Sequence, residues 1–204
     1  MQIPVGQMAN FSYILADEDK SEAAVIDPSW DLEKIFAVLK NNGWKVKYII
    51  NTHTHFDHIL GNLEVAAVTG AKIVQHKNST QPNDIPVEDG QIITIGKIMI
   101  RVIHTPGHSK DSMSLVVNKE LVLTGDTLFI GNCGRVDLPG SDASEMYDSL
   151  FEKIANLDEF LIVYPGHNYG PTQTSTIGQE KKTNYVLKAR SREDFLRFMA
   201  NADE

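Results

Sequence analysis

The sequence predicts an α/β fold, and three observations support this prediction. Residues 46–50 form a short apolar run rich in β-branched side chains, which is typical of a buried strand. Residues 59–69 follow with apolar residues at helical spacing and stop at Gly70, as helices often do. Later strand-like segments end in turns that contain glycine: residues 97–103, 121–123 and 161–164. We therefore expect strands that carry functional loops at their carboxyl ends, as α/β sheets do.

The remaining elements follow in order along the chain. Residues 11–15 and 23–26 read as early strands. Two amphipathic helices are predicted where apolar residues recur at helical spacing, at Leu32, Ile35, Phe36 and Leu39 and at Tyr147, Leu150, Phe151 and Ile154. Two capping pairs mark helix starts, Asp142 with Glu145 and Ser191 with Asp194. Residues 77–84 read as a polar surface loop.

Composition limits the classes of protein to consider. The 204 residues contain no linker-like stretch, so we expect one domain over residues 1–204. No apolar run is long enough to span a membrane, residues 1–8 lack the form of a signal peptide, and the single cysteine, Cys133, fits a reducing compartment, so a cytoplasmic location is expected. We expect Cys133 to be a small buried residue and not a nucleophile. The net charge of −8 argues against a nucleic-acid partner.

The strongest motif is Thr-His-Thr-His-Phe-Asp-His at residues 52–58. It places His53, His55, Asp57 and His58 within six residues, in a chain that has only seven histidines. Imidazole nitrogen and carboxylate oxygen are the usual ligands of zinc, iron and manganese. Because the first three alternate and His58 directly follows Asp57, one short loop can direct ligands to two neighbouring points. The motif therefore predicts two adjacent metal ions.

Three further ligand-type residues follow later strands: His108 in Pro-Gly-His, Asp126 in Thr-Gly-Asp and His167 in Pro-Gly-His. Each motif alone is often only a turn, but their placement at strand ends matches that of the first cluster. His76 and His104 lack this placement, and we expect His104 to be a structural histidine. Asp27, at the end of the strand at residues 23–26, is either an outer-sphere support for a ligand histidine or an ordinary turn carboxylate.

These seven residues resemble the pattern of the metallo-beta-lactamase superfamily, in which His-x-His-x-Asp-His is followed by a His, an Asp and a His. The resemblance covers residues 11 to about 184. It implies a four-layer αβ/βα sandwich with the metals at one edge between two sheets. It also implies one metal held by His53, His55 and His108, another held by Asp57, His58 and His167, and Asp126 bridging them. Zinc is the first expectation for both ions, with iron or manganese as alternatives.

Within that superfamily, three stretches look like the glyoxalase II branch: residues 104–108, residues 124–135 and residues 164–167. The same stretches also resemble the persulfide dioxygenases, which share the scaffold but use one iron. Only a few dozen residues follow His167, fewer than the helical glutathione-binding domain of a standard glyoxalase II. The resemblance implies a small-molecule substrate, such as a glutathione or other thiol conjugate.

The leading hypothesis is a hydrolase that uses a dinuclear metal site to activate water against a thioester, with Asp57 binding metal and orienting the water. The first alternative is a mononuclear iron persulfide dioxygenase, because His53, His108 and Asp126 form a two-histidine, one-carboxylate set. The second is a non-catalytic metal-binding domain. The ligand set alone does not separate the first two.

Three residues are candidates for binding substrate. Arg135 suits a substrate carboxylate because its guanidinium is planar, although a structural salt bridge with Asp137 is an equal alternative. Asn168 and Tyr169 are candidates only because they follow His167. No feature of the sequence decides the oligomeric state, and a homodimer stays open.

Overall fold

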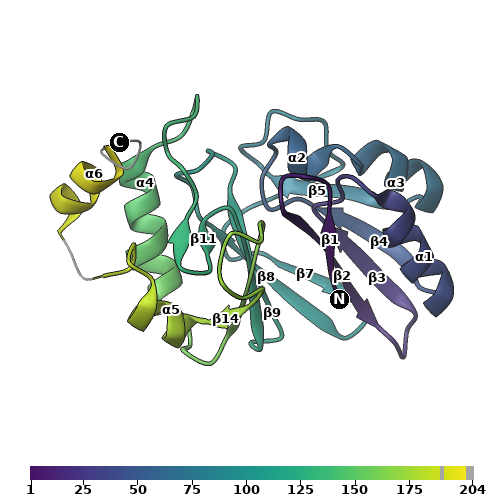
Figure 1. Cartoon of the computed structure of the whole chain (residues 1–204). Coiled ribbons are helices and arrows are strands. Elements are labelled where there is room, and N and C mark those ends of the chain that lie inside the picture. Colours follow the sequence, from purple (N-terminus) through teal and green to yellow (C-terminus); the bar gives the residue numbers. More distant parts are fainter. Residues whose placement is uncertain (189–190, 201–204) are drawn as a thin grey trace.

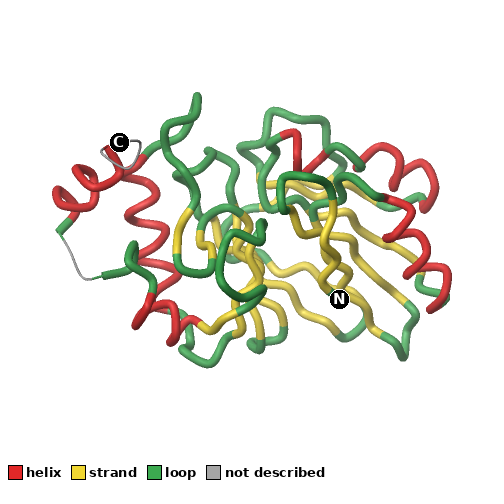
Figure 2. Tube along the Cα trace, in the orientation of Figure 1, coloured by secondary structure: helices red, strands yellow, loops and turns green. Residues whose placement is uncertain are grey.

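The computed structural model describes residues 1–188 and 191–200. Two six-stranded sheets pack face to face, and helices cover the outer side of each (Figure 1). Figure 2 shows the same layers, with the strands in the middle and the helices at the two ends of the view. The predicted α/β class and the four-layer sandwich are therefore confirmed.

The first sheet contains the N-terminal strands in the order β1-β2-β3-β4-β5-β6. Their bounds are β1 (Gln2–Val5), β2 (Asn10–Asp17), β3 (Glu22–Ile26), β4 (Lys45–Ile50), β5 (Lys72–His76) and β6 (Ile85–Val87). Strands β3 to β6 run parallel, so β3, β4 and β5 end at the same edge. Helix α1 (Leu32–Asn42) and helix α3 (Asn62–Thr69) cover the outer face.

The second sheet has the order β14-β13-β10-β9-β8-β7. Its strands are β7 (Ile92–Ile95), β8 (Ile98–His104), β9 (Met113–Val117), β10 (Leu121–Gly125), β13 (Ile162–Pro165) and β14 (Ser175–Thr176). Strands β11 (Leu128–Phe129) and β12 (Asn132–Cys133) form a small separate ribbon. The outer helices are α4 (Ala143–Tyr147), continued by η1 (Asp148–Lys153) and η2 (Ile154–Asn156), then α5 (Ile177–Thr183) and α6 (Arg192–Ala200).

Three apolar layers hold this sandwich together. The central layer lies between the sheets and includes Phe11, Ile50 and Leu115, all with 1% or less of their surface exposed. A second layer joins the first sheet to α1 and α3, and a third joins the second sheet to its helices. Because burial of apolar surface is the main favourable contribution to folding, the layers also fix how the two sheet edges meet.

The helix predicted over residues 59–69 is confirmed for residues 62–69 and for its end at Gly70, which has a left-handed conformation, but its start differs. The segment forms a short helix α2 (Phe56–Ile59), a break at Leu60 and Gly61, and then α3. A Cβ on Gly61 would lie 2.5 Å from the Leu32 side chain, so the chain approaches α1 closely at the break. Helix α3 buries Asn62 and Val65. The apolar residues that suggested the helix are exposed, namely Leu60 (56%), Leu63 (77%) and Val68 (65%).

Other expectations hold with small shifts of bounds. Strands cover the predicted segments as β2, β3, β4, β8, β10 and β13, and α1 and the α4–η1–η2 helix cover the two amphipathic patterns. Asp142 caps α4 by accepting from the backbone N–H groups of Ser144 and Glu145. Cys133 is buried, as expected.

Candidate metal centre

The seven candidate ligands lie at one edge of the sandwich, where the ends of several strands meet. The loop after β4 carries His53 and His55 and leads into α2, which carries Asp57 and His58. His108 lies in the loop between β8 and β9, Asp126 directly follows β10, and His167 follows β13 by two residues. The topology thus brings together residues that are up to 114 positions apart, from His53 to His167.

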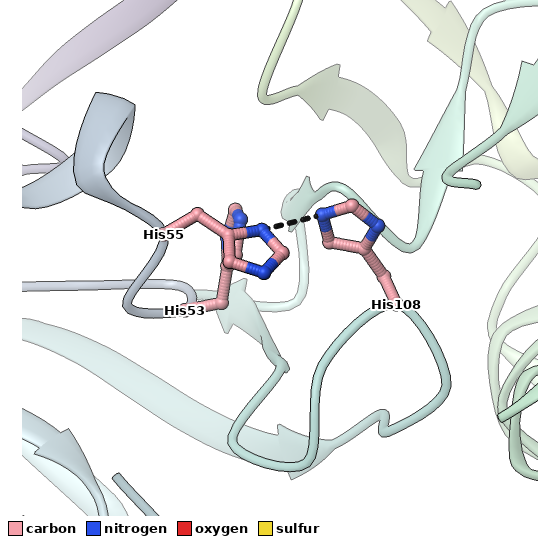
Figure 3. Close-up of side chains that lie close together, drawn as sticks. All are labelled: His53, His55 and His108. Atoms are coloured by element: carbon pink, nitrogen blue, oxygen red, sulfur yellow. Dashed lines mark hydrogen bonds between the residues drawn. The ribbon is translucent and has the colours of Figure 1, made fainter. Parts of the chain in front are cut away.

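The first group of ligand atoms comes from His53, His55 and His108, and these atoms lie within 4.8 Å of one another. Figure 3 shows the three rings facing a common point. The Nδ1 atom of His55 lies 2.9 Å from Nε2 of His108. His53 and His108 are buried, whereas His55 is partly exposed. This group has the composition of a three-histidine metal site.

The second group is Asp57, His58 and His167, all three buried. The Nε2 atoms of His58 and His167 lie 3.2 Å apart. The Oδ2 atom of Asp57 is 3.5 Å from Nε2 of His58 and 3.4 Å from Nε2 of His167. Two imidazoles and one carboxylate therefore face a second point beside the first.

Asp126 lies between the two groups. Its Oδ1 is 3.5 Å from His58 Nε2, and its Oδ2 is 3.6 Å from His108 Nε2 and 3.2 Å from His167 Nε2. The backbone comes close to it here: a Cβ on Gly166 would lie 2.2 Å from Asp126 Oδ1, so only glycine fits beside this carboxylate. The geometry matches a carboxylate shared by two neighbouring ions.

Outer hydrogen bonds fix which nitrogen of each ring faces the centre. Nδ1 of His58 donates to Asp27, Nδ1 of His108 donates to the Arg135 carbonyl, and Nδ1 of His167 donates to the Met8 carbonyl, at 3.1, 2.9 and 2.8 Å. With Nδ1 carrying the proton, Nε2 of each neutral ring presents a lone pair to the centre. The lone pairs of His58 and His167 then face each other, an arrangement that needs a proton or a cation between them.

Two buried atoms at the centre have no hydrogen-bond partner among the described residues, Nε2 of His53 and Oδ1 of Asp126. A buried polar atom without a partner costs free energy, so native structures rarely leave one unexplained. Both atoms belong to the ligand set, and both are types that bind zinc and iron. The residues present therefore fit a pair of divalent metal ions.

The acid–base properties of the second group also favour a bound cation. Burial lowers the pKa of His167, but hydrogen bonds to Asp126 and Asp57 outweigh it and raise that pKa to about 10. Burial raises the pKa of Asp57, but the hydrogen bond from His167 and the charge of His58 hold it below its usual range. The carboxylates of Asp57 and Asp126 thus favour a positive charge between them, and a divalent ion supplies more positive charge than a proton does.

Asp27 forms the hydrogen bond to a candidate ligand histidine that the first of its two readings expected. Its Oδ1 accepts from the Thr52 backbone N–H at 2.7 Å and its Oδ2 from the Thr52 hydroxyl at 2.6 Å, besides the bond from His58. Asp27 itself has a positive φ of 48°. This buried carboxylate therefore holds both the start of the ligand loop and the ring of His58.

Asn10 belongs to the same environment, although the sequence analysis missed it. Its amide Nδ2 donates to the Asp57 carbonyl at 3.1 Å and to Asp57 Oδ2 at 3.0 Å, and only 2% of the residue is exposed. Asn10 also forms an isolated β-bridge with His167. No motif marks it, because it lies at the first position of an ordinary strand some 40 residues before the cluster.

A cavity of about 520 Å³ opens at the centre. Its lining includes five of the ligands, namely His55, Asp57, His108, Asp126 and His167, together with Met8, Phe56, Arg135, Leu138, Pro139 and Tyr169. Arg135 also pairs with Asp137, so the salt bridge that the sequence left open is present, while a role in binding substrate stays a prediction. Tyr169 lines the cavity, whereas Asn168 is exposed, is not part of the lining and binds Ala9 through its backbone N–H.

His76 and His104 lie outside the centre, as their positions in the sequence predicted. Their rings stack on each other, and His104 Nε2 donates to the Lys110 carbonyl at 2.9 Å. The expectation of a structural histidine at 104 agrees with these contacts. Among the described residues, no helix is long and apolar enough to cross a membrane.

Comparison with known proteins places these features in context. The family model of the Metallo-beta-lactamase superfamily matches residues 5–80 and 75–167. The human mitochondrial persulfide dioxygenase ETHE1 is 34% identical over 194 residues, covering 94% of this chain and 76% of that protein. A hydroxyacylglutathione hydrolase of Polaromonas is 37% identical over 166 residues, covering 78% of this chain but only 62% of the hydrolase. The crystal structure of ETHE1 from Myxococcus xanthus superposes with a TM-score of 0.94 at 29% identity, covering 100% of this chain and 91% of that one.

Proposed function

This chain belongs to the metallo-beta-lactamase superfamily, and on that premise we propose that it is a metal-dependent hydrolase of thioesters of the acyl-glutathione type. We propose that His53, His55 and His108 hold one ion and that Asp57, His58 and His167 hold the other, with Asp126 between them. Zinc is our first choice of metal. The proposed substrate is a small molecule.

The ligand set alone does not separate the two enzymes, so one observation of the structure supports this proposal: two adjoining groups of ligand atoms share a carboxylate, and outer hydrogen bonds hold ligands of both. A mononuclear enzyme needs only one such group. The second group here is buried and held by Asn10, Asp27 and the Met8 carbonyl. A hydrolase that uses two ions explains why this support surrounds both groups.

When bound, such ions lower the pKa of a coordinated water towards neutrality and polarise a substrate carbonyl. The protein residues have separate tasks. Asp57 is oriented by Asn10, so its carboxylate can position the attacking water and accept its proton. Arg135 at the cavity lining is placed to bind a substrate carboxylate through its planar guanidinium.

The test is a thiol-release assay on protein purified without chelator. A hydroxyacyl-glutathione should release free thiol at the same rate in air and under nitrogen, and metal analysis should find about two ions per chain. Thiol release that ceases without oxygen, or no release from metal-loaded protein, would overturn the hydrolase. A chelated sample restored by zinc serves as the control.

A persulfide dioxygenase is the second candidate. The human persulfide dioxygenase ETHE1 and the ETHE1 protein of Myxococcus xanthus match over most of their length and of this chain. His53, His108 and Asp126 supply the two histidines and one carboxylate typical of mononuclear iron oxygenases. Oxygen uptake with glutathione persulfide, together with one tightly held iron per chain and no thioester cleavage, would establish this function instead.

A further inference from the structure

The mouth of the cavity is built mainly from apolar side chains. Apart from the candidate ligands, the described residues of its lining are Met8, Phe56, Leu138, Pro139, Tyr169 and one cation, Arg135. These residues come from separate segments: the turn before β2, the start of α2, the loop after β12 and the segment after β13. Four parts of the chain therefore converge to place apolar groups around one opening.

Three of these side chains are also exposed to solvent. Met8 is 43% exposed, Phe56 61% and Tyr169 57%. Single exposed apolar residues are common on protein surfaces, but several that gather around a concave site indicate a binding surface. Small-molecule sites are concave, are lined mostly by apolar and aromatic groups, and have volumes of roughly 300–1,000 Å³. This cavity, at about 520 Å³, fits that description.

Ring contacts hold the aromatic part of the mouth in place. Tyr169 stacks on His167 with ring centroids 4.7 Å apart, and its hydroxyl donates to the Met8 carbonyl at 3.3 Å. Phe56 meets Trp30 edge to face at 6.2 Å. An apolar surface that is already ordered loses little conformational entropy when a ligand binds.

The charges at the mouth also favour an apolar ligand. Within residues 1–188 and 191–200, Arg135 is the only lysine or arginine that lines the cavity, and the carboxylate of Asp137 pairs with it. The polar groups deeper in the cavity are the candidate metal ligands. The rim thus offers one charge-compensated cation and five apolar side chains to the part of the substrate outside the reacting centre.

We propose that this mouth binds an apolar acyl chain, so that the preferred thioesters carry an aliphatic or aromatic acyl group in place of a small hydroxylated one. The inference rests on the proposed thioesterase function and narrows its substrate class. Complete burial of one methylene contributes up to about 0.8 kcal/mol, roughly a fourfold change in affinity. In a mouth that is partly open to solvent, each methylene is only partly buried, and we expect about a twofold change in affinity. Selectivity should therefore grow steadily with chain length.

The experiment measures kcat/KM for acetyl, butanoyl and hexanoyl thioesters of N-acetylcysteamine, a neutral carrier, and for lactoyl, acetyl and hexanoyl thioesters of glutathione. Binding of the non-hydrolysable S-methyl and S-hexyl thioethers of N-acetylcysteamine is measured in parallel by calorimetry. We expect hexanoyl to exceed acetyl by about tenfold to a hundredfold on either carrier, and to exceed lactoyl on glutathione.

Two mouth variants test the location. Leu138→Asn and Phe56→Ala should each reduce the hexanoyl-to-acetyl ratio roughly threefold or more, with metal content unchanged. Leu63→Asn is the matched control, because Leu63, the one leucine of α3, is 77% exposed and does not line the cavity. A Leu63→Asn variant that lowers the ratio as much as Leu138→Asn would refute the location.

The outcomes separate this inference from the function on which it rests. If thioesters are cleaved at rates that do not depend on chain length, the proposal of an apolar acyl-binding mouth is refuted and the proposed hydrolase function is retained. Suppose that thioether binding grows with chain length and is weakened in Leu138→Asn, but no thioester is cleaved. This result supports the apolar mouth and refutes the hydrolase function. Equal binding of the two thioethers overturns the inference whether or not thioesters are cleaved.

Discussion

The imidazole rings of His76 and His104 stack face to face, with centroids 3.9 Å apart and planes 9° from parallel. His76 is the last residue of β5 and His104 the last residue of β8, so the stack joins the two sheets beside the loop that carries His108. Two neutral imidazole rings can stack at this distance, whereas two imidazolium ions repel each other. The stack should therefore be sensitive to acid.

We predict that this stack makes the fold less stable as the pH falls from about 6.5 to about 4. Burial, followed by the charge of His104, lowers the pKa of His76 from 6.5 to about 4. Between these values the unfolded chain binds the proton and the folded chain does not, so stability is lost with falling pH. The loss attributable to His76 is about 2 kcal/mol at pH 5.

Urea denaturation of the protein and of His76→Gln at pH 7.0, 6.0 and 5.0 measures this loss. The difference in free energy of unfolding between the two proteins should shrink towards pH 5, because glutamine does not titrate. Parallel stability curves for the two proteins would contradict the prediction. Comparison with the variant removes the contribution of the histidines at the metal centre, which both proteins share.

Replacement of His167 by alanine should remove about one metal ion per chain and leave the other in place. The physical reason is that His167 belongs to the group with Asp57 and His58 and not to the three-histidine group. Plasma emission spectroscopy on protein purified without chelator measures the content. His104→Gln provides a histidine control outside the centre, and unchanged metal content in His167→Ala would exclude His167 as a ligand.

Replacement of Asp57 by asparagine should lower kcat by a factor of about 10² to 10⁴, with a smaller change in KM. Proton transfer by a positioned side chain typically contributes this much to a rate. The change keeps the shape of the side chain but removes the basic oxygen. Steady-state kinetics with matched metal content measures the effect, and a variant of full activity but lower melting temperature would reduce Asp57 to a structural role.

Asn10→Ala should weaken the affinity for the second metal ion by roughly 10- to 100-fold, because groups that hold ligands from the outer sphere typically contribute this much. The amide of Asn10 donates to Asp57 Oδ2, which would be left less constrained. Competition with a coloured chelator measures the two affinities separately. Asn42→Ala is the control, since Asn42 is an exposed residue of α1, and equal affinities in protein and Asn10→Ala would refute the role.

The Arg135–Asp137 pair should control the response to anionic substrates. Arg135→Ala should raise KM for an acyl-glutathione severalfold with little change in kcat, because it removes binding common to ground and transition states. Asp137→Asn should lower that KM, because it removes the carboxylate that pairs with the guanidinium. The strength of this ion pair depends on salt concentration. A neutral N-acetylcysteamine thioester is the control substrate, and equal effects on both substrates would contradict the prediction.

The sequence predicted the fold and selected candidate ligands that the structure brings together, because both leave local signals. Strands such as β4 and β10 are short apolar runs, and His108 and His167 each follow a Pro-Gly turn. Seven ligand-type residues in one pattern also gave the resemblance that implied the sandwich. These features depend on residues that are close in the sequence, so they can be recognised without a structure.

The parts that escaped prediction depend on contacts between distant residues. Asn10 reaches Asp57 only because β2 lies beside α2, and no local pattern encodes this. The break between α2 and α3 arises where Gly61 meets Leu32 of α1, and α3 packs through Asn62, whose side chain bonds that of Asn51. A buried asparagine appears polar in any hydropathy pattern, so the sequence suggested the wrong face of the helix.

The contacts between the start of β2 and the segment after β13 have a consequence for how the protein folds. The Phe11 N–H donates to the Gly166 carbonyl, the Asn168 N–H to the Ala9 carbonyl, and His167 Nδ1 to the Met8 carbonyl. These bonds join residues more than 150 positions apart, so their formation carries the entropic cost of closing a long loop. During synthesis on the ribosome, the group of candidate ligands Asp57, His58 and His167 therefore stays incomplete until the chain has been made past His167.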